Sequence, residues 1–187
     1  MRNKGYTMIE TMIAVSLFLV VVITGMGALL NANLLHHKSQ DMSSIIDNLS
    51  FILEDMSRNL RTGYNYHCID DGNVSDFSPH SCSNGGGISF ESATGDPVNN
   101  NDQWVYGIYP DGSIQKSVDG GTMFVILTPP EIKINTISSS FSVLGAEPPP
   151  DTRQPFVIIR LVGSITFKNV VTPFSIQTSV SQRLIDI

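Results

Sequence analysis

A lone carboxylate lies at the edge of the longest apolar run in the sequence. Glu10 comes just before an apolar stretch from Met12 to Leu30, and no formally charged residue lies between Thr11 and His37. An ionised carboxylate carried toward lipid costs about 3 kcal/mol unless another group neutralises it. Glu10 is therefore expected to need a cationic partner.

Two cysteines lie close to two histidines, a combination that can hold zinc. His67 precedes Cys68, and His80 lies two residues before Cys82. The spacing departs from the usual two-residue zinc knuckles. A basic N-terminal end keeps that end in the cytoplasm and places the rest of the chain outside it, where disulfides persist. The sequence favours a disulfide between Cys68 and Cys82, with zinc binding and free thiols as the alternatives.

Acidic side chains gather in two polar segments. Carboxylate oxygens suit Ca²⁺, but neither segment has the spacing of an EF-hand loop. Solvated loops are therefore favoured over calcium sites. The residues are Asp70, Asp71, Asn73 and Asp76 in the first segment, and Asp96 and Asp102 in the second.

No pattern typical of a catalytic site occurs in the chain. The His-Glu-x-x-His, Gly-x-Ser-x-Gly and Walker patterns are all missing from the sequence. The formal net charge is −6, and the 11 Lys and Arg residues are too few and too scattered for a general phosphate-binding surface. The sequence predicts no enzyme, no cofactor and no nucleic-acid partner.

The apolar run predicts a helix that crosses a membrane. Its length of about 19 residues, at ~1.5 Å each, matches a hydrocarbon core of ~30 Å. Arg2 and Lys4 precede it, so the positive-inside rule leaves the N-terminus in the cytoplasm. We expect a single-pass protein of the inner membrane.

The helix is predicted to continue beyond the membrane as an amphipathic segment. No proline interrupts Tyr6 to Thr62, and Gly63 offers a helix stop that is free to take a positive φ. One helix of about 55 residues results, with lipid or sister helices around its first half and a sheet against its second. The expected apolar stripe of the second half is Met42, Ile45, Ile46, Leu49, Ile52, Leu53, Met56 and Leu60.

The N-terminal residues resemble those of type IV pilins and pseudopilins. The shared features are a short basic leader, Gly5, Glu10 and an unbroken apolar helix, with Tyr6 where Phe or Met is more usual. The resemblance implies cleavage by a prepilin peptidase between Gly5 and Tyr6, methylation of the new terminal amine, and an assembly role for Glu10. A secretory signal peptide fits less well, because the apolar run is too long. A simple signal anchor remains an alternative.

The remainder of the chain reads as a β-rich head. Between Tyr64 and Asn101, only Gly87 to Glu91 has a strand pattern. A hairpin turn is predicted at Pro110-Asp111-Gly112, where Pro fixes φ and Gly supplies a positive φ. The other expected strands are 104–109, 113–117, 123–127, 131–144, 156–167 and 173–184.

The fold class is therefore α+β, a long N-terminal helix on a mainly antiparallel sheet. The expected parts are a leader (1–5), a transmembrane and assembly helix (6–31), an amphipathic continuation (32–63) and an extracytoplasmic head (64–187). The closing strand, Ser175 to Arg183, looks like that of minor pilins and pseudopilins of the J/W type.

The function expected from this resemblance is structural. The chain would be a minor pilin or pseudopilin of a type IV pilus or a type II secretion-like filament. Its expected partners are the prepilin peptidase, other pilins or pseudopilins, the inner-membrane assembly machinery and membrane lipid. The alternative is a membrane-anchored extracytoplasmic binding protein that is not assembled into a filament. Which filament system uses the chain depends on proteins encoded elsewhere.

Overall fold

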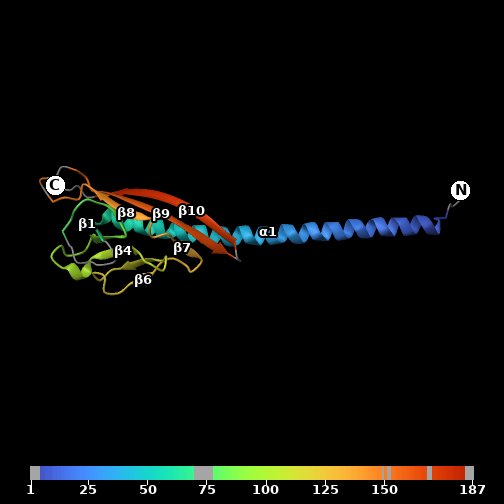
Figure 1. Cartoon of the computed structure of the whole chain (residues 1–187), viewed down its shortest axis with the longest axis horizontal. Helices are drawn as coiled ribbons and strands as arrows, with labels where there is room; N and C mark the ends of the chain where they lie inside the picture. Colours follow the sequence, from blue (N-terminus) through green and yellow to red (C-terminus); the bar gives the residue numbers. More distant parts are fainter. Residues whose placement is uncertain (1–4, 70–77, 149, 151–152, 168–169, 184–187) are drawn as a thin grey trace. The chain divides into compact units, whose positions relative to one another are not determined.

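The computed structural model describes residues 5–69, 78–148, 150, 153–167 and 170–183. Its described helices are α1 (Met8–Thr62), an α-helix 55 residues long, and the short 3-10 helix η1 (Asn100–Asp102). The chain forms two units, Met1–Ser44 and Ile45–Ile187. The first unit is helical in its described part from Met8 on, and the second contains the end of α1 and all the described strands (Figure 1).

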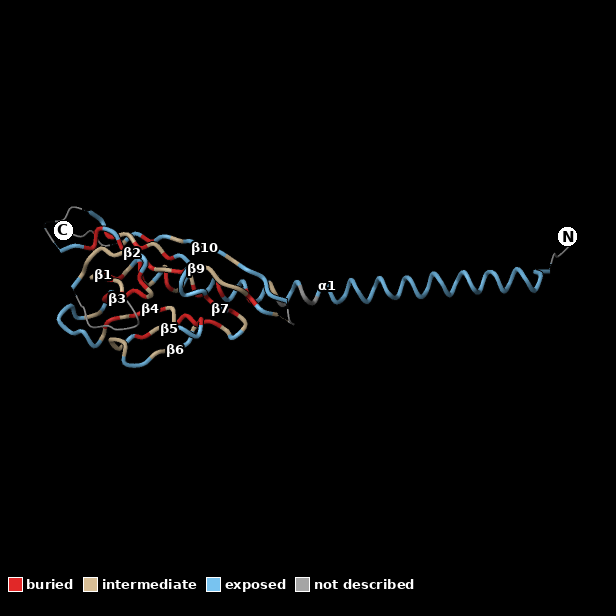
Figure 2. Tube along the Cα trace, in the orientation of Figure 1, coloured by how far each residue is buried: buried red, intermediate tan, exposed pale blue. Residues whose placement is uncertain are grey.

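The part of α1 in the second unit is amphipathic, as predicted. Five members of the expected stripe are buried at intervals of three and four residues: Ile45, Leu49, Ile52, Met56 and Leu60. Figure 2 shows that the free-standing part of α1 is exposed along its length and that the buried residues gather among the strands. Ile46 is an exception and is exposed. Adjacent side chains on a helix point about 100° apart. Because Ile45 points toward the strands, the side chain of Ile46 points away from them.

Gly63 ends the helix for a different reason from the one expected. Positive φ occurs at four described glycines, Gly112, Gly120, Gly121 and Gly145, and Gly63 is not among them. A Cβ on Gly63 would instead stand 2.8 Å from the Glu91 carbonyl oxygen and would overlap the Phe90 ring. Glycine is required here because a neighbouring strand passes too close for a side chain.

The described strands form two antiparallel sheets of five strands each. The first sheet follows the order β1, β3, β4, β5, β6, and its β4–β5 hairpin turns at Pro110-Asp111-Gly112, as predicted, with Gly112 at φ +78°. The strands of this sheet are β1 (Tyr64–Ile69), β3 (Gly87–Glu91), β4 (Trp104–Ile108), β5 (Ile114–Ser117) and β6 (Val125–Ile126).

The second sheet follows the order β10, β9, β8, β2, with β7 also paired to β9. Its two longest strands are paired over their whole length, from Val170 opposite Phe167 to Ser181 opposite Phe156. Along β10, Phe174, Ile176, Thr178 and Val180 face inward as expected, and the residues between them are exposed. The strands are β2 (Cys82–Gly85), β7 (Ile132–Ile134), β8 (Ser140–Leu144), β9 (Phe156–Phe167) and β10 (Val170–Ser181).

Two strands lie where the sequence predicted loops. β1 and β2 fall inside the polar region after the helix, and each has one non-glycine residue at positive φ, Asn65 at 55° and Asn84 at 61°. The register shifts within both pairings, so neither strand has the regular alternation that marks a strand in a sequence. The single strand expected over 131–144 is instead two, β7 and β8. Asn135 breaks it, because its side chain accepts bonds from the amides of Ile137 and Ser138.

A polar network fastens α1 to the first sheet. The Tyr106 hydroxyl on β4 donates to Asp55 at 3.1 Å and accepts from the Asn59 side-chain amide at 2.8 Å. Lys116 on β5 lies 3.5 Å from the same Asp55 carboxylate and 4.1 Å from the centre of the Trp104 ring. Burial raises the pKa of Tyr106, so its hydroxyl stays protonated and able to donate.

Candidate functional site

The predicted cleavage residues lie in accessible backbone ahead of the helix. Gly5 and Tyr6 are exposed, and a Cβ on Gly5 would meet no atom within 4 Å. Helix α1 begins only at Met8, and the Thr7 carbonyl accepts the first hydrogen bonds, from the amides of Glu10 at 3.1 Å and Thr11 at 3.2 Å. The Gly5–Tyr6 bond is therefore outside the hydrogen-bonded helix, where a protease can bind the chain in an extended form.

Glu10 lies in the first turn of α1 and is exposed. A carboxylate in this turn is favoured by the positive end of the helix dipole. Glu10 follows the Gly5–Tyr6 bond by four residues in sequence. The structure places Gly5, Tyr6 and Glu10 close in sequence at one exposed end, and their roles in processing and assembly remain predictions.

The helix that follows has the surface of a membrane span. Met8–His36 is long and apolar enough to cross a membrane, and none of it is buried within the chain. The hydroxyls of Thr11, Ser16 and Thr24 bond back to helix carbonyls at 2.8–2.9 Å, so these polar groups need no water. A Cβ on Gly25 or Gly27 would meet nothing within 4 Å. The whole circumference of this segment is open to lipid or to other helices.

The two cysteines form the predicted disulfide. Cys68 on β1 and Cys82 on β2 are joined with a Cα–Cα distance of 5.9 Å. The neighbouring rings of His67 and His80 lie 6.1 Å apart, but the sulfurs that would complete a zinc site are bonded to each other. Within the described part of the chain, no three His, Cys, Asp or Glu side chains are grouped so as to hold a metal.

Of the two acidic segments, the structure describes only the second. The first, Asp70 to Asp76, lies outside the described residues. In the second, the carboxylates cap amides of their own loop: Asp102 accepts from the Asp96 amide at 2.9 Å, and Asp96 accepts from the Val98 amide at 3.0 Å. These bonds are what a solvated loop would make.

Sequence reasoning missed Glu91, which lies beside this second loop. Glu91 is the last residue of β3 and is completely buried, although a charged residue at a strand end is normally exposed. Burial, followed by the charges of Asp102 and Asp96, raises the pKa of Glu91, whereas the Gln103 side chain acts in the opposite direction. No sequence signal marked this position, because only the fold closes the loop over it.

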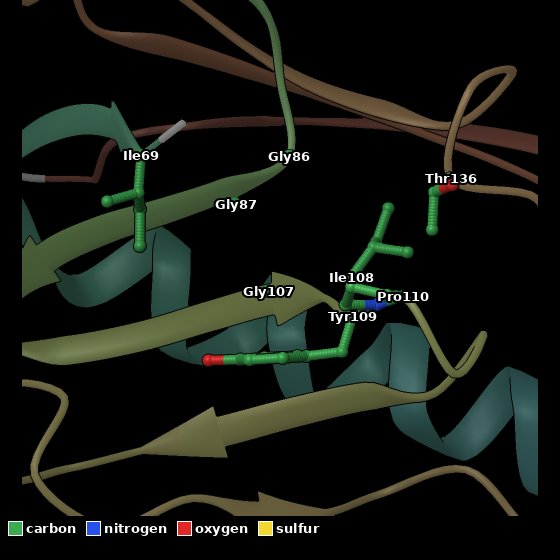
Figure 3. Close-up of a pocket in the computed structure, with 8 residues that line it drawn as sticks. All are labelled: Ile69, Gly86, Gly87, Gly107, Ile108, Tyr109, Pro110 and Thr136. Atoms are coloured by element: carbon green, nitrogen blue, oxygen red, sulfur yellow. The ribbon is translucent and has the colours of Figure 1, made fainter. Parts of the chain in front are cut away.

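The head also contains a pocket of about 370 Å³ at the start of β3 and the end of β4. Three glycines, Gly86, Gly87 and Gly107, expose bare backbone on one side of it, and Figure 3 shows Tyr109 and Ile108 beside them. None of its lining residues is charged, so it has neither a nucleophile–base pair nor a metal ligand set. The remaining lining residues are Ile69, Pro110 and Thr136.

Comparison with known proteins gives one match. No curated protein and no solved structure matches the chain. The family model described as the prokaryotic N-terminal methylation motif matches residues 1–26. This segment contains Gly5, Tyr6 and Glu10 and continues into the exposed apolar helix. The chain therefore carries, over residues 1–26, the N-terminal signature of type IV pilins and pseudopilins.

Proposed function

We propose that the chain is a structural subunit, a minor pilin or pseudopilin, of a type IV pilus or a type II secretion-like filament. The observation that carries this proposal is the methylation motif at residues 1–26, at the head of a helix that buries none of its apolar side chains within its own chain. Proteins with this signature are structural rather than enzymatic. An apolar helix surface of this kind needs lipid before assembly and other helices after it.

The first step is processing of the N-terminus. A prepilin peptidase cuts between Gly5 and Tyr6, and the new amine of Tyr6 is methylated. The exposed Gly5, with no neighbour to obstruct a bound protease, supports this step. The new amine has an ordinary pKa near 8 and is therefore a cation at neutral pH.

The second step is insertion of the helix into the filament. Glu10 accepts the terminal amine of a neighbouring subunit, or that of its own chain before the transfer. Two opposite charges ~4 Å apart attract by about 4 kcal/mol at an effective dielectric constant of 20, and this attraction offsets the cost of placing Glu10 among apolar helices. A helix in the wrong register would leave a bare charge, so the pair selects one register.

The proposed location is the inner membrane, with the N-terminus in the cytoplasm and the head outside it. The partners in this scheme are the prepilin peptidase, membrane lipid, the assembly machinery and other pilins or pseudopilins. Inclusion in the J/W group of minor subunits rests on the resemblance of the closing strand, Ser175 to Arg183.

The decisive experiment expresses Glu10→Val and Glu10→Gln chains in cells that contain the filament machinery. Both variants are expected to insert and to be cleaved normally, and both are expected to lower cross-linking to partner pilins, because neither carries the charge. Glu54→Gln, on an exposed position of the helix within the second unit, is the matched control. Undiminished cross-linking and filament number in both Glu10 variants would contradict the assembly role.

The glycine-lined pocket supports the second candidate, a membrane-anchored binding protein. A cavity of about 370 Å³ is large enough for a small molecule. Shearing filaments from cells distinguishes the anchored binding protein from the filament subunit. An anchored binder stays in the membrane fraction when filaments are sheared from cells, whereas a subunit is released with them.

A further inference from the structure

The glycine-lined pocket of the head adjoins a second cavity, which is polar. The second cavity has a volume of about 550 Å³, and Gly86 and Thr136 line both cavities. The two together are called the Gly86 groove below. Its apolar part is the pocket of Figure 3, and its polar part is lined in addition by Asn84, Ile137, Ser138, Ser139, Ser140 and Arg160.

Bare backbone forms the floor of the apolar part. Gly87 on β3 is paired directly with Gly107 on β4, so no side chain stands on either strand at this point. A Cβ on Gly107 would be 3.1 Å from the Tyr109 ring, so this ring already packs against the glycine backbone. In Figure 3 the Thr136 side chain points toward that of Ile108 across the pocket. A floor and walls of this kind suit a large apolar side chain, which is stabilised when it leaves water.

Among the described residues that line the groove, Arg160 is the only charged one. It is exposed on β9, and its guanidinium makes no hydrogen bond or ion pair with another described residue. The chain as a whole has a formal net charge of −6, so an unpaired cation beside an apolar cavity favours a negatively charged ligand. A guanidinium donates two parallel hydrogen bonds to a carboxylate, which makes this group a good match.

The polar part of the groove offers more hydrogen-bonding groups than one carboxylate requires. The side chains of Asn84, Ser138 and Ser140 make no hydrogen bond with another described residue. An amide and two hydroxyls both donate and accept, which is what the backbone amides of a peptide need. A ligand with peptide groups next to its carboxylate uses these side chains, whereas a simple aryl acid leaves them to water.

The walls of the polar part are fixed by bonds within the head. The Asn84 amide donates to the Ser142 hydroxyl at 3.2 Å. The Asn135 side chain accepts from the amides of Ile137 and Ser138, both at 3.0 Å. Because this backbone is held in place before a ligand arrives, binding loses little free energy to ordering of the loop.

We propose that the Gly86 groove binds the free C-terminal end of a peptide chain whose last side chain is large and apolar. That side chain enters the glycine-floored part, and the terminal carboxylate pairs with Arg160. The preceding peptide groups bond to Asn84, Ser138 and Ser140. Capture of a chain end by its carboxylate is an established way to recognise a peptide. This ligand class deepens the second candidate function, on whose pocket it rests, and a filament subunit can carry the same groove.

The test is a fluorescence anisotropy titration of the full chain in detergent micelles. The probe is an N-terminally labelled peptide, Gly-Ser-Gly-Ser-Gly-Phe, with a free carboxyl end, and micelles without protein give the background. Saturable binding is expected. Amidation of the carboxyl end is expected to weaken binding by about tenfold or more, because the charge-assisted hydrogen bonds to Arg160 are lost. Replacing the last residue by Ser is expected to weaken it similarly, since the apolar part then stays unfilled.

Variants locate the site. Arg160→Gln is expected to weaken binding of the acid peptide by about tenfold and to remove the difference between the acid and the amide. Arg183→Gln removes another exposed arginine, one that does not line the groove, and is the matched control. Gly86→Val should also weaken binding, because a Cβ there would find no atom nearer than 3.9 Å and the side chain fills the groove without a clash. The urea midpoint of each variant shows whether it is folded.

Three results would overturn the proposal. Absence of saturable binding by the acid peptide would show that the groove takes no chain end. Equal binding of the acid and the amide to the wild-type chain would remove the role of Arg160. Binding of phenylpropionate as tight as that of the peptide would show that the groove takes a free aryl acid. Each of these results leaves the cross-linking test of Glu10 unaffected, so failure of this proposal is distinguishable from failure of the filament assignment.

Discussion

Glu91 is expected to make the stability of the head depend on pH. Burial raises its folded-state pKa above the ordinary value near 4.5, so the folded state holds the proton more tightly than the unfolded chain does. The resulting stabilisation is complete below the unfolded pKa and is lost as pH rises through the folded pKa. Glu91→Gln carries no such titration, and so the variant should gain stability relative to the wild type as pH rises above 4.5.

The measurement is the urea midpoint of unfolding of both chains across this pH range. Wild type and variant are compared at each pH, because other carboxylates titrate in the opposite sense. Hydrogen bonds from Ser113, Ser117 and Ser81 lower the pKa of Asp111, Asp119 and Glu147 respectively, and their stabilisation is lost as pH falls. A difference between the two chains that is constant with pH would show that Glu91 does not titrate in this range.

Gly63 is expected to tolerate no side chain. In Gly63→Ala the new Cβ would meet the Phe90 ring and the Glu91 carbonyl, and overpacking of this kind costs about 1–3 kcal/mol. Gly86→Ala is the matched control, since the nearest atom to its Cβ, the Ile69 carbonyl oxygen, is 3.9 Å away. Urea unfolding should show a lower midpoint for the first variant only, and equal midpoints would mean that the strand can move aside.

At the scale of elements, the disulfide connects the two sheets. Cys68 belongs to β1 of the first sheet and Cys82 to β2 of the second, and the two positions are 14 apart in sequence. Replacing both cysteines by serine should lower the free energy of unfolding by about 3 kcal/mol, the value for closing a loop of this length. Changing both residues together avoids leaving a reactive thiol. A loss well under 1 kcal/mol would mean that the ladders β1–β3 and β2–β8 hold the segment without it.

The elements that the sequence predicted well are those with regular periods or distinctive turn residues. The helix, its buried stripe, the turn at Gly112 and the alternation along β10 all follow from local patterns. β1 and β2 could not be predicted, because polar residues and register shifts remove the alternation and long-range pairing holds the strands. Glu91 was missed for a related reason. All five residues of β3 are buried, so the strand has no solvent face on which a charge would be noticed.

At the scale of the whole molecule, the second unit is expected to fold without the first. Every buried apolar side chain in the described residues lies at or beyond Ile45. A chain that begins at Ile45 should therefore be water-soluble and keep the unfolding temperature of the full protein. Circular dichroism in the near ultraviolet would check its tertiary packing. A truncated chain without fixed packing would show that the first unit contributes to the stability of the head.

The chain is also expected to be a low-copy component of its filament. The loop-rich head and the resemblance of the closing strand to minor subunits both favour this position. Quantitative mass spectrometry of sheared filaments should find this chain at a small fraction of the main subunit. Finding it as the dominant component would instead make it a major pilin.

The Cys68–Cys82 disulfide between the two sheets also determines when a newly made subunit completes its fold. In the proposed topology the thiols of Cys68 and Cys82 meet an oxidant only after the head has left the cytoplasm, so the covalent connection forms only after export. The enzymes that oxidise thiols in that compartment would then limit the rate at which finished subunits are supplied. Cells that lack them should accumulate a reduced, protease-sensitive pool of this chain, while synthesis and insertion continue at their usual pace.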